Sequence, residues 1–146
     1  MPFVNIEEIE SREIIEGASS KFIHTDGMTF AVWTFKKGAV LPEHSHFHEQ
    51  ITKRISGEFE MTLDGETITF TDKDVAVIPP NAVHSGKAIT DCVMLDIFNP
   101  VREDYRSSAI KWAAETALNF FIYLQQPFRQ SRLSGFSEDI QADPPD

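Results

Sequence analysis

The chain has 146 residues and a formal net charge of −10 at pH 7. This length suits a single domain with its own core, and the acidic balance argues against nucleic acid as a partner, because phosphate binding needs a basic face. The single cysteine, Cys92, excludes an intramolecular disulfide and fits a reducing compartment. No apolar run approaches the roughly 20 residues of a membrane span, and no signal peptide is evident. We therefore expect a cytoplasmic protein with no membrane partner.

The first part of the chain has the pattern of short strands. Apolar and aromatic residues fall between turn residues such as Gly17 and Gly38, which is typical of strands in a small sheet protein. The predicted strands are residues 12–15, 20–24, 28–35, 40–46 and 49–56.

Strands continue as far as residue 98. Residues 58–63 alternate between apolar and polar, and Asp64-Gly65 predicts a hairpin turn with positive φ before the return strand 66–70. Val75–Ile78 is predicted to be a buried strand that ends at Pro79-Pro80. The next strand starts at His84, and residues 91–98 form the last. Many short strands with Gly, Pro and Asp turns predict an all-β sandwich or barrel.

The character of the sequence changes after Pro100. Residues 107–124 have apolar positions near helical spacing, although Phe120–Leu124 could also form a strand. The end of the chain is polar and proline-containing, which is typical of disorder. We therefore expect a barrel over residues 1–106 and a C-terminal extension over residues 107–146, helical at first and then disordered.

Histidines gather around the fourth and fifth predicted strands. Because side chains alternate along an extended chain, His44, His46 and Gln50 share one face, and His84 follows the proline-rich turn downstream. Three imidazoles and an amide oxygen that converge from two strands can hold a divalent metal. Glu49 is the competing fourth ligand, but its parity points it away from His46.

Two further histidines receive lesser roles. His48 shares the parity of His46, but three alternate residues of one strand cannot all reach one ion, so we expect His48 to support a ligand. His24 has no partner in the sequence and is expected to be structural or exposed. Neutral imidazoles and a neutral amide would leave the charge of a dication uncompensated, which favours a small anionic substrate. Nickel, zinc, iron or manganese would suit these ligands, so the identity of the metal stays open.

The last predicted strand contains a carboxylate. Its valine, leucine and isoleucine share one face, which we expect to be buried, so Asp96 lies with Met94 and Phe98 on the face toward the barrel interior or its mouth. A buried carboxylate needs a partner. Asp96 either pairs with an arginine for structure or acts as an acid or base near the metal. Arg102, where the chain leaves the barrel, could clamp a carboxylate through two hydrogen bonds.

Two stretches resemble the paired motifs of the cupin superfamily, which are small β-barrels with a metal in the mouth. The first motif falls on Gly38, His44, His46, Gln50 and Gly57, with glutamine where glutamate is usual. The second motif matches at Pro79 and His84 and departs from the family at Lys73, Asn81 and Ala88. The resemblance covers roughly residues 10–106. It implies a single cupin β-barrel or jelly roll, with a homodimer formed through sheet edges.

A closer resemblance is to the pectin-degradation, KdgF-type cupins. It is carried by residues 44–52, 56–60 and 95–105. The resemblance implies an isomerase-type metalloenzyme that ketonises and ring-opens 4,5-unsaturated uronates. The metal ligands that it implies are His44, His46, Gln50 and His84, and the catalytic or substrate-contacting residues are Asp96, Phe98 and Arg102.

Some alternatives stay open at this stage. The same ligands could serve a metal-dependent dioxygenase, or the chain could be a non-enzymatic cupin that binds a sugar acid. Arg54 shares the parity of Gln50, so either a bulge turns it outward or it adds a cation to the cavity. Cys92 is expected to be an inert, packed thiol.

Overall fold

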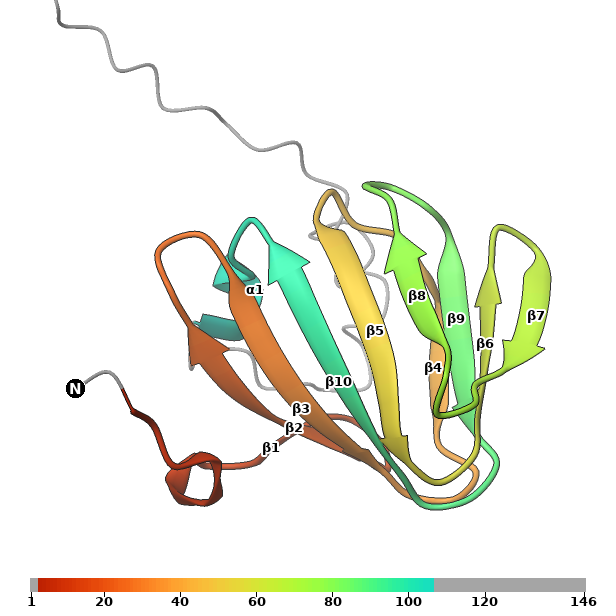
Figure 1. Cartoon of the computed structure of the whole chain (residues 1–146), viewed down its shortest axis with the longest axis horizontal. Coiled ribbons are helices and arrows are strands. Elements are labelled where there is room, and N and C mark those ends of the chain that lie inside the picture. Colours follow the sequence, from red (N-terminus) through yellow and green to blue (C-terminus); the bar gives the residue numbers. More distant parts are fainter. Residues whose placement is uncertain (1–2, 107–146) are drawn as a thin grey trace, which may run out of the picture.

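The computed structural model describes residues 3–106, which form ten strands in two antiparallel sheets (Figure 1). The six-stranded sheet has the order β1 (Arg12–Ile15), β2 (Ala18–His24), β3 (Thr29–Phe35), β10 (Cys92–Asn99), β5 (Glu49–Ser56) and β8 (Val75–Ile78). The four-stranded sheet has the order β4 (Val40–His44), β9 (His84–Ala88), β6 (Phe59–Leu63) and β7 (Glu66–Thr69). A short 3-10 helix (Ile6–Glu8) precedes β1, and α1 (Glu103–Arg106) follows β10. The predicted all-β jelly roll is confirmed.

Aromatic side chains fill the space between the sheets. Phe35 of β3 and Phe59 of β6 belong to different sheets, and their rings lie 5.1 Å apart. Phe22 of β2 stacks on Tyr105 of α1 at 4.6 Å. These contacts bury large apolar areas, which is the main favourable contribution to folding, and they hold α1 against the barrel.

The strand β10 lies between β3 and β5 and has a clear inner face. The inner face carries Met94, Asp96 and Phe98, which are buried, so the predicted inward orientation of Asp96 is confirmed. The valine, leucine and isoleucine of the opposite face are half-buried rather than buried. The expectation of burial was wrong there because these residues point away from the four-stranded sheet.

The expectation that Val75–Ile78 is a buried strand was also wrong. It forms β8, but β8 is an edge strand that pairs only with β5 among the described strands. Ile78 is fully buried, whereas Val75 and Val77 are 51% and 58% exposed. A continuous apolar run suggested burial on both faces, but an edge strand of a sandwich buries only one of them.

Two smaller details also differ from the sequence prediction. The strand predicted over 40–46 ends at His44, so His46 lies in the connection between β4 and β5. Arg54 stays on the inner face opposite Met94, and the strand irregularity follows it. Its guanidinium donates to the carbonyl of Gly57, and Arg54 is not among the residues that line the histidine pocket. Neither alternative for Arg54 holds as stated, because the shift in strand register does not turn it outward and its guanidinium does not line the pocket.

The predicted helix over residues 107–124 and the predicted disordered tail lie outside the described residues. No helix within the described part of the chain is both long and apolar enough to cross a bilayer.

Candidate metal centre

Strand register brings the predicted ligands together. His44 ends β4 and His84 begins β9, and the two residues are direct partners across the sheet, with ring centroids 4.1 Å apart. His46 lies in the following connection, with its ring 5.0 Å from that of His84. Each of these three histidines offers a ring nitrogen within 4.8 Å of the others, and all three are buried. The structure therefore places three histidines where they can hold one ion.

Backbone carbonyls fix how these rings are oriented. Nδ1 of His44 lies 2.8 Å from the carbonyl of Pro42, and Nδ1 of His84 lies 2.9 Å from the carbonyl of Ala82. A carbonyl oxygen can only accept, so each Nδ1 carries the proton and each Nε2 keeps its lone pair for a ligand bond. Nε2 of His84 is buried and has no hydrogen-bond partner among residues 3–106.

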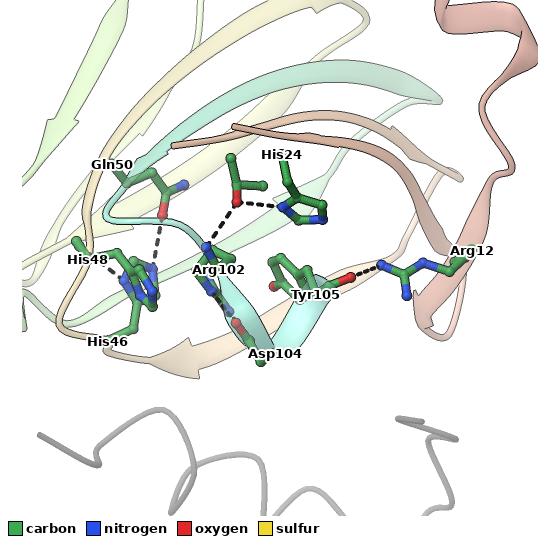
Figure 2. A network of polar contacts seen from close by, with 9 residues as sticks. Arg12, His24, His46, His48, Gln50, Arg102, Asp104 and Tyr105 are labelled. Atoms are coloured by element: carbon green, nitrogen blue, oxygen red, sulfur yellow. Dashed lines mark hydrogen bonds and ion pairs between the residues drawn. The ribbon is translucent and has the colours of Figure 1, made fainter. Parts of the chain in front are cut away.

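His46 makes two contacts that a neutral imidazole cannot both satisfy. Its Nδ1 lies 3.1 Å from the carbonyl of His48, and its Nε2 lies 3.0 Å from Oε1 of Gln50 (Figure 2). A neutral ring carries only one N–H, whereas both partners are oxygen acceptors. A cation at Nε2 would remove the conflict, because Nδ1 could then donate to the carbonyl while Nε2 and Oε1 both face the ion.

Burial keeps the three rings neutral. It lowers the pKa of His44 to about 3, with a further contribution from His84, and it lowers the pKa of His46 to about 2, with a further contribution from Arg102. Burial also lowers the pKa of His84. Neutral imidazole is the form that binds metals, so the residues present fit a divalent metal.

Gln50 is presented to the histidines by its own neighbours. It is 4% exposed, and its Nε2 donates to Oγ1 of Thr52 at 2.8 Å, which leaves Oε1 directed at His46. Glu49, the competing ligand, is exposed on the opposite face. The structure therefore places Gln50, and not Glu49, against His46 and in the same pocket as His44.

Asp96 lies at the end of the same hydrogen-bonded line. Its Oδ1 accepts from Oγ1 of Thr52 at 2.6 Å. Burial raises the pKa of Asp96 to about 6, although hydrogen bonds from Thr52 and Gln50 act to lower it. The sequence left open whether Asp96 pairs with an arginine or acts as an acid or base. Within residues 3–106 Asp96 forms no ion pair with Arg102, because Arg102 pairs with Asp104.

Arg102 and Asp104 form a buried pair that the sequence did not reveal. Nε and Nη2 of Arg102 donate to the two carboxylate oxygens of Asp104 at 2.9 and 2.6 Å (Figure 2). The guanidinium also lies over the rings of Phe98 and Tyr105, at 4.8 and 4.0 Å. Arg102 thus clamps a carboxylate in the expected two-bond geometry, but the carboxylate belongs to its own chain. Three of its five N–H groups are not used by Asp104.

A short network anchors this arginine to the sheet. The backbone N–H of Arg102 donates to Oγ1 of Thr29 at 2.9 Å, and the same hydroxyl lies 2.8 Å from Nδ1 of His24. Arg12 donates to the backbone carbonyl of Tyr105 (Figure 2). The position of His24 agrees with the expectation that it is structural.

The other sequence predictions have mixed outcomes. His48 is buried, but its ring is not part of the ligand group, and it is the backbone carbonyl that reaches His46. Its role as a supporting residue stays a prediction. Cys92 is buried, and burial raises the pKa of its thiol to about 11, as expected for a packed thiol. Thr52, Asp104 and Tyr105 were missed because their importance depends on cross-strand register and on the path of the chain after β10.

A small pocket joins these groups into one site. It is lined on its apolar side by Trp33, Phe35, Leu41, Phe98 and Tyr105, and on its polar side by His44, His46, Gln50, Asp96 and Arg102. Aromatic faces beside a cation, a carboxyl group and metal-binding groups suit a small anionic ligand with several oxygens.

Comparison with known proteins identifies similar cupins. The cupin domain family matches residues 31–98. The pectin degradation protein KdgF of Dickeya dadantii (strain 3937) is 28% identical over 102 residues, which covers 68% of this chain and 93% of that protein. The structure of KdgF from Halomonas sp. is 31% identical with a TM-score of 0.66, and it covers 70% of this chain and 96% of its own. An RmlC-like cupin from Shewanella frigidimarina NCIMB 400 is 28% identical with a TM-score of 0.68, covering 72% and 96%.

Proposed function

The chain belongs to the cupin superfamily and is similar to KdgF proteins, and on this premise we propose that it ketonises and ring-opens small 4,5-unsaturated uronates with the help of a divalent metal. The three converging histidines and Gln50 are the proposed ligands. The observation that carries the proposal is the unbroken line of buried contacts from His46 to Asp96, because it places a titratable carboxyl group beside the ligand group.

The proposed reaction is an isomerisation in which atoms and electrons balance without an oxidant. The anomeric hydroxyl loses its proton and becomes a carbonyl as the bond between C1 and the ring oxygen breaks. The released enolate becomes the C5 ketone when C4 takes up a proton. A divalent metal bound to the histidines and Gln50 would polarise a substrate oxygen and offset its charge.

Asp96 is the proposed proton carrier. Its carboxyl group is buried and its pKa is raised to about 6, so it can both accept and release a proton near neutral pH. Oδ1 is engaged by the Thr52 hydroxyl, and the exchanging proton is therefore assigned to Oδ2.

Arg102 and Phe98 are the proposed substrate-positioning residues. Arg102 lines the pocket and uses two N–H groups for Asp104, and it also hydrogen-bonds to Tyr105. The N–H groups that these two partners leave are the ones that we propose for a substrate carboxylate. Phe98 lies opposite Gln50 in the pairing of β10 with β5, where its ring forms one wall of the pocket.

The test is the Asp96→Asn variant with an unsaturated uronate monomer as substrate. We expect its metal content to match that of the wild type and its turnover to fall by about 10²- to 10⁴-fold, the usual contribution of a general acid or base. Loss of the unsaturated chromophore measures turnover, and elemental analysis measures the metal. Asp72→Asn, at an exposed position, is the matched control. Near-normal turnover of Asp96→Asn would remove Asp96 from the mechanism.

The same assay separates the alternative functions. The proposed isomerase works without oxygen, whereas a dioxygenase would stop in an anaerobic chamber and would consume oxygen with its substrate. A binding protein would retain the uronate and return it chemically unchanged. The expected homodimer, the cytoplasmic location and the domain boundary at residue 106 stay predictions.

A further inference from the structure

Thr52 occupies a position that the proposed reaction does not use directly. It is 2% exposed on the inner face of β5, two residues after Gln50 and directly opposite Asp96 on β10. A threonine here could simply fill space in the core. Its hydroxyl, however, bonds on both sides to residues of the site.

With the exchanging proton of Asp96 assigned to Oδ2, the hydrogen atoms of this line have one arrangement, in which the Gln50 amide also donates toward the Asp96 carboxyl group. Oγ1 of Thr52 donates its single proton to Oδ1 of Asp96 at 2.6 Å, so it can offer only lone pairs to Gln50 at 2.8 Å. The amide nitrogen of Gln50 is a donor and its oxygen is an acceptor. The nitrogen must therefore face Thr52, and the oxygen must face His46, as observed at 3.0 Å.

From this geometry we propose that Thr52 is a positioning residue, which sets the orientation of the Gln50 amide so that oxygen, and not N–H, faces the metal. The inference rests on the proposed function for the metal site. An amide has two nearly isosteric ends, and the N–H₂ end would repel a cation. A carboxylate has oxygen at both ends and would need no such guide, which ties the role of Thr52 to the glutamine at position 50.

The experiment is a double-mutant cycle read out by metal affinity. Nickel(II) and zinc(II) are titrated against a chromophoric chelator for Thr52→Val, Gln50→Glu and the combined variant. Valine keeps the shape of threonine, removes both hydrogen bonds of the hydroxyl group and leaves the contact of Gln50 with Asp96 in place. We expect Thr52→Val to weaken metal binding about 10- to 100-fold, the usual effect of losing a residue that orients a ligand. In the Gln50→Glu background the same change should cost less than about threefold, because no amide remains to be oriented.

Two controls bracket the cycle. Thr52→Ser keeps the hydroxyl and should restore near wild-type affinity. Thr67→Val removes an exposed Thr–Thr hydrogen bond in β7 and should leave affinity unchanged. If Thr52→Val does not fold, Thr52→Ala tests the same pair of hydrogen bonds in both backgrounds.

The outcomes separate this inference from the proposed reaction. Equal losses of affinity in the glutamine and glutamate backgrounds, or no loss in either, would overturn the positioning role. A wild-type chain that binds neither ion would overturn it together with the metal site. A wild-type chain that binds metal but leaves unsaturated uronates unchanged would overturn the proposed reaction alone, since the affinity cycle does not depend on turnover.

Discussion

At the scale of single residues, two buried carboxyl groups of this site behave in opposite ways. Burial acts to raise the pKa of Asp104, but the charge and hydrogen bonds of Arg102 bring it below its usual value. Asp96 has no such ion pair, and burial raises its pKa to about 6. Arg102 therefore keeps Asp104 ionised. Asp96 has a pKa close to neutral pH, so it can exchange a proton there.

This arrangement implies that Asp96 reduces the stability of the metal-free fold. Folding raises the pKa of Asp96 from 3.8 to about 6. One pKa unit corresponds to about 1.4 kcal/mol, so the ionised carboxylate lowers the free energy of unfolding by about 3 kcal/mol. The cost is complete above the folded pKa and absent below the unfolded value, since the folded state binds the proton more tightly. We expect the stability of Asp96→Asn relative to the wild type to rise by up to about 3 kcal/mol between pH 4 and pH 8.

Urea unfolding of both metal-free proteins across this range measures the effect. Asp72→Asn, which removes an exposed carboxyl group, again serves as the control. A difference between Asp96→Asn and the wild type that is constant with pH would show that the carboxyl group is not strained by burial.

Sequence reasoning at this scale could place Asp96 and Gln50 on inner faces, because parity along a strand is a local property. It could not show that Thr52 lies between them, since that depends on the pairing of β5 with β10. Asp104 was missed for a similar reason. Its partnership with Arg102 depends on the chain turning back over the pocket in α1.

At the scale of elements, the turns show the same division between local and long-range information. Asp64 and Gly65 both have positive φ, at 49° and 86°, as their residue types predicted. Gly57 also has positive φ, at 79°, but its strongest constraint comes from residues far along the chain. A Cβ at Gly57 would lie 2.1 Å from the carbonyl oxygen of Asp91 and 2.5 Å from Cβ of Cys92.

The two glycines therefore form a matched pair for a stability measurement. A Cβ at Gly65 would meet nothing within 4 Å. Gly65→Ala should therefore lower the free energy of unfolding only by the strain of a left-handed alanine, about 1–2 kcal/mol. Gly57→Ala should cost about 1–3 kcal/mol more, because the backbone near Asp91 must also move. Denaturant unfolding of both variants measures the difference. Equal losses of stability in the two variants would mean that the backbone near Gly57 can move to make room for a Cβ with little strain.

Edge position explains why the burial of β8 was misjudged. Strand length and type could be read for β8 from its apolar residues and the prolines that follow. Whether its second face is covered depends on the order of strands in the sheet, which no local pattern contains. The histidine positions were easier to predict. His44 and His84 lie at the ends of paired strands, and the spacing of residues in the two motifs indicates where those strands end.

At the scale of the whole molecule, the proposed metal site joins the two sheets. His44 and His84 come from the four-stranded sheet, and Gln50 comes from the six-stranded sheet. An ion held by all of them would link the layers at the pocket end, in addition to the aromatic core. Since the unfolded chain does not preserve this arrangement, binding should stabilise the fold.

We expect nickel(II) or zinc(II) at 100 times its dissociation constant to raise the free energy of unfolding by about 2.7 kcal/mol, and a chelator to reverse the effect. The increment should stay nearly constant from pH 7 to pH 5, because the folded-state pKa values of His44 and His46 are about 3 and 2, and protons compete little in that range. Chemical unfolding of the loaded and metal-free protein at each pH measures this increment. His24→Gln, a histidine outside the ligand group, should keep the full increment, whereas His44→Ala should lose most of it. An increment that survives in His44→Ala would place the stabilising ion elsewhere on the molecule, and one that disappears by pH 6 would mean that the rings take up protons despite their burial.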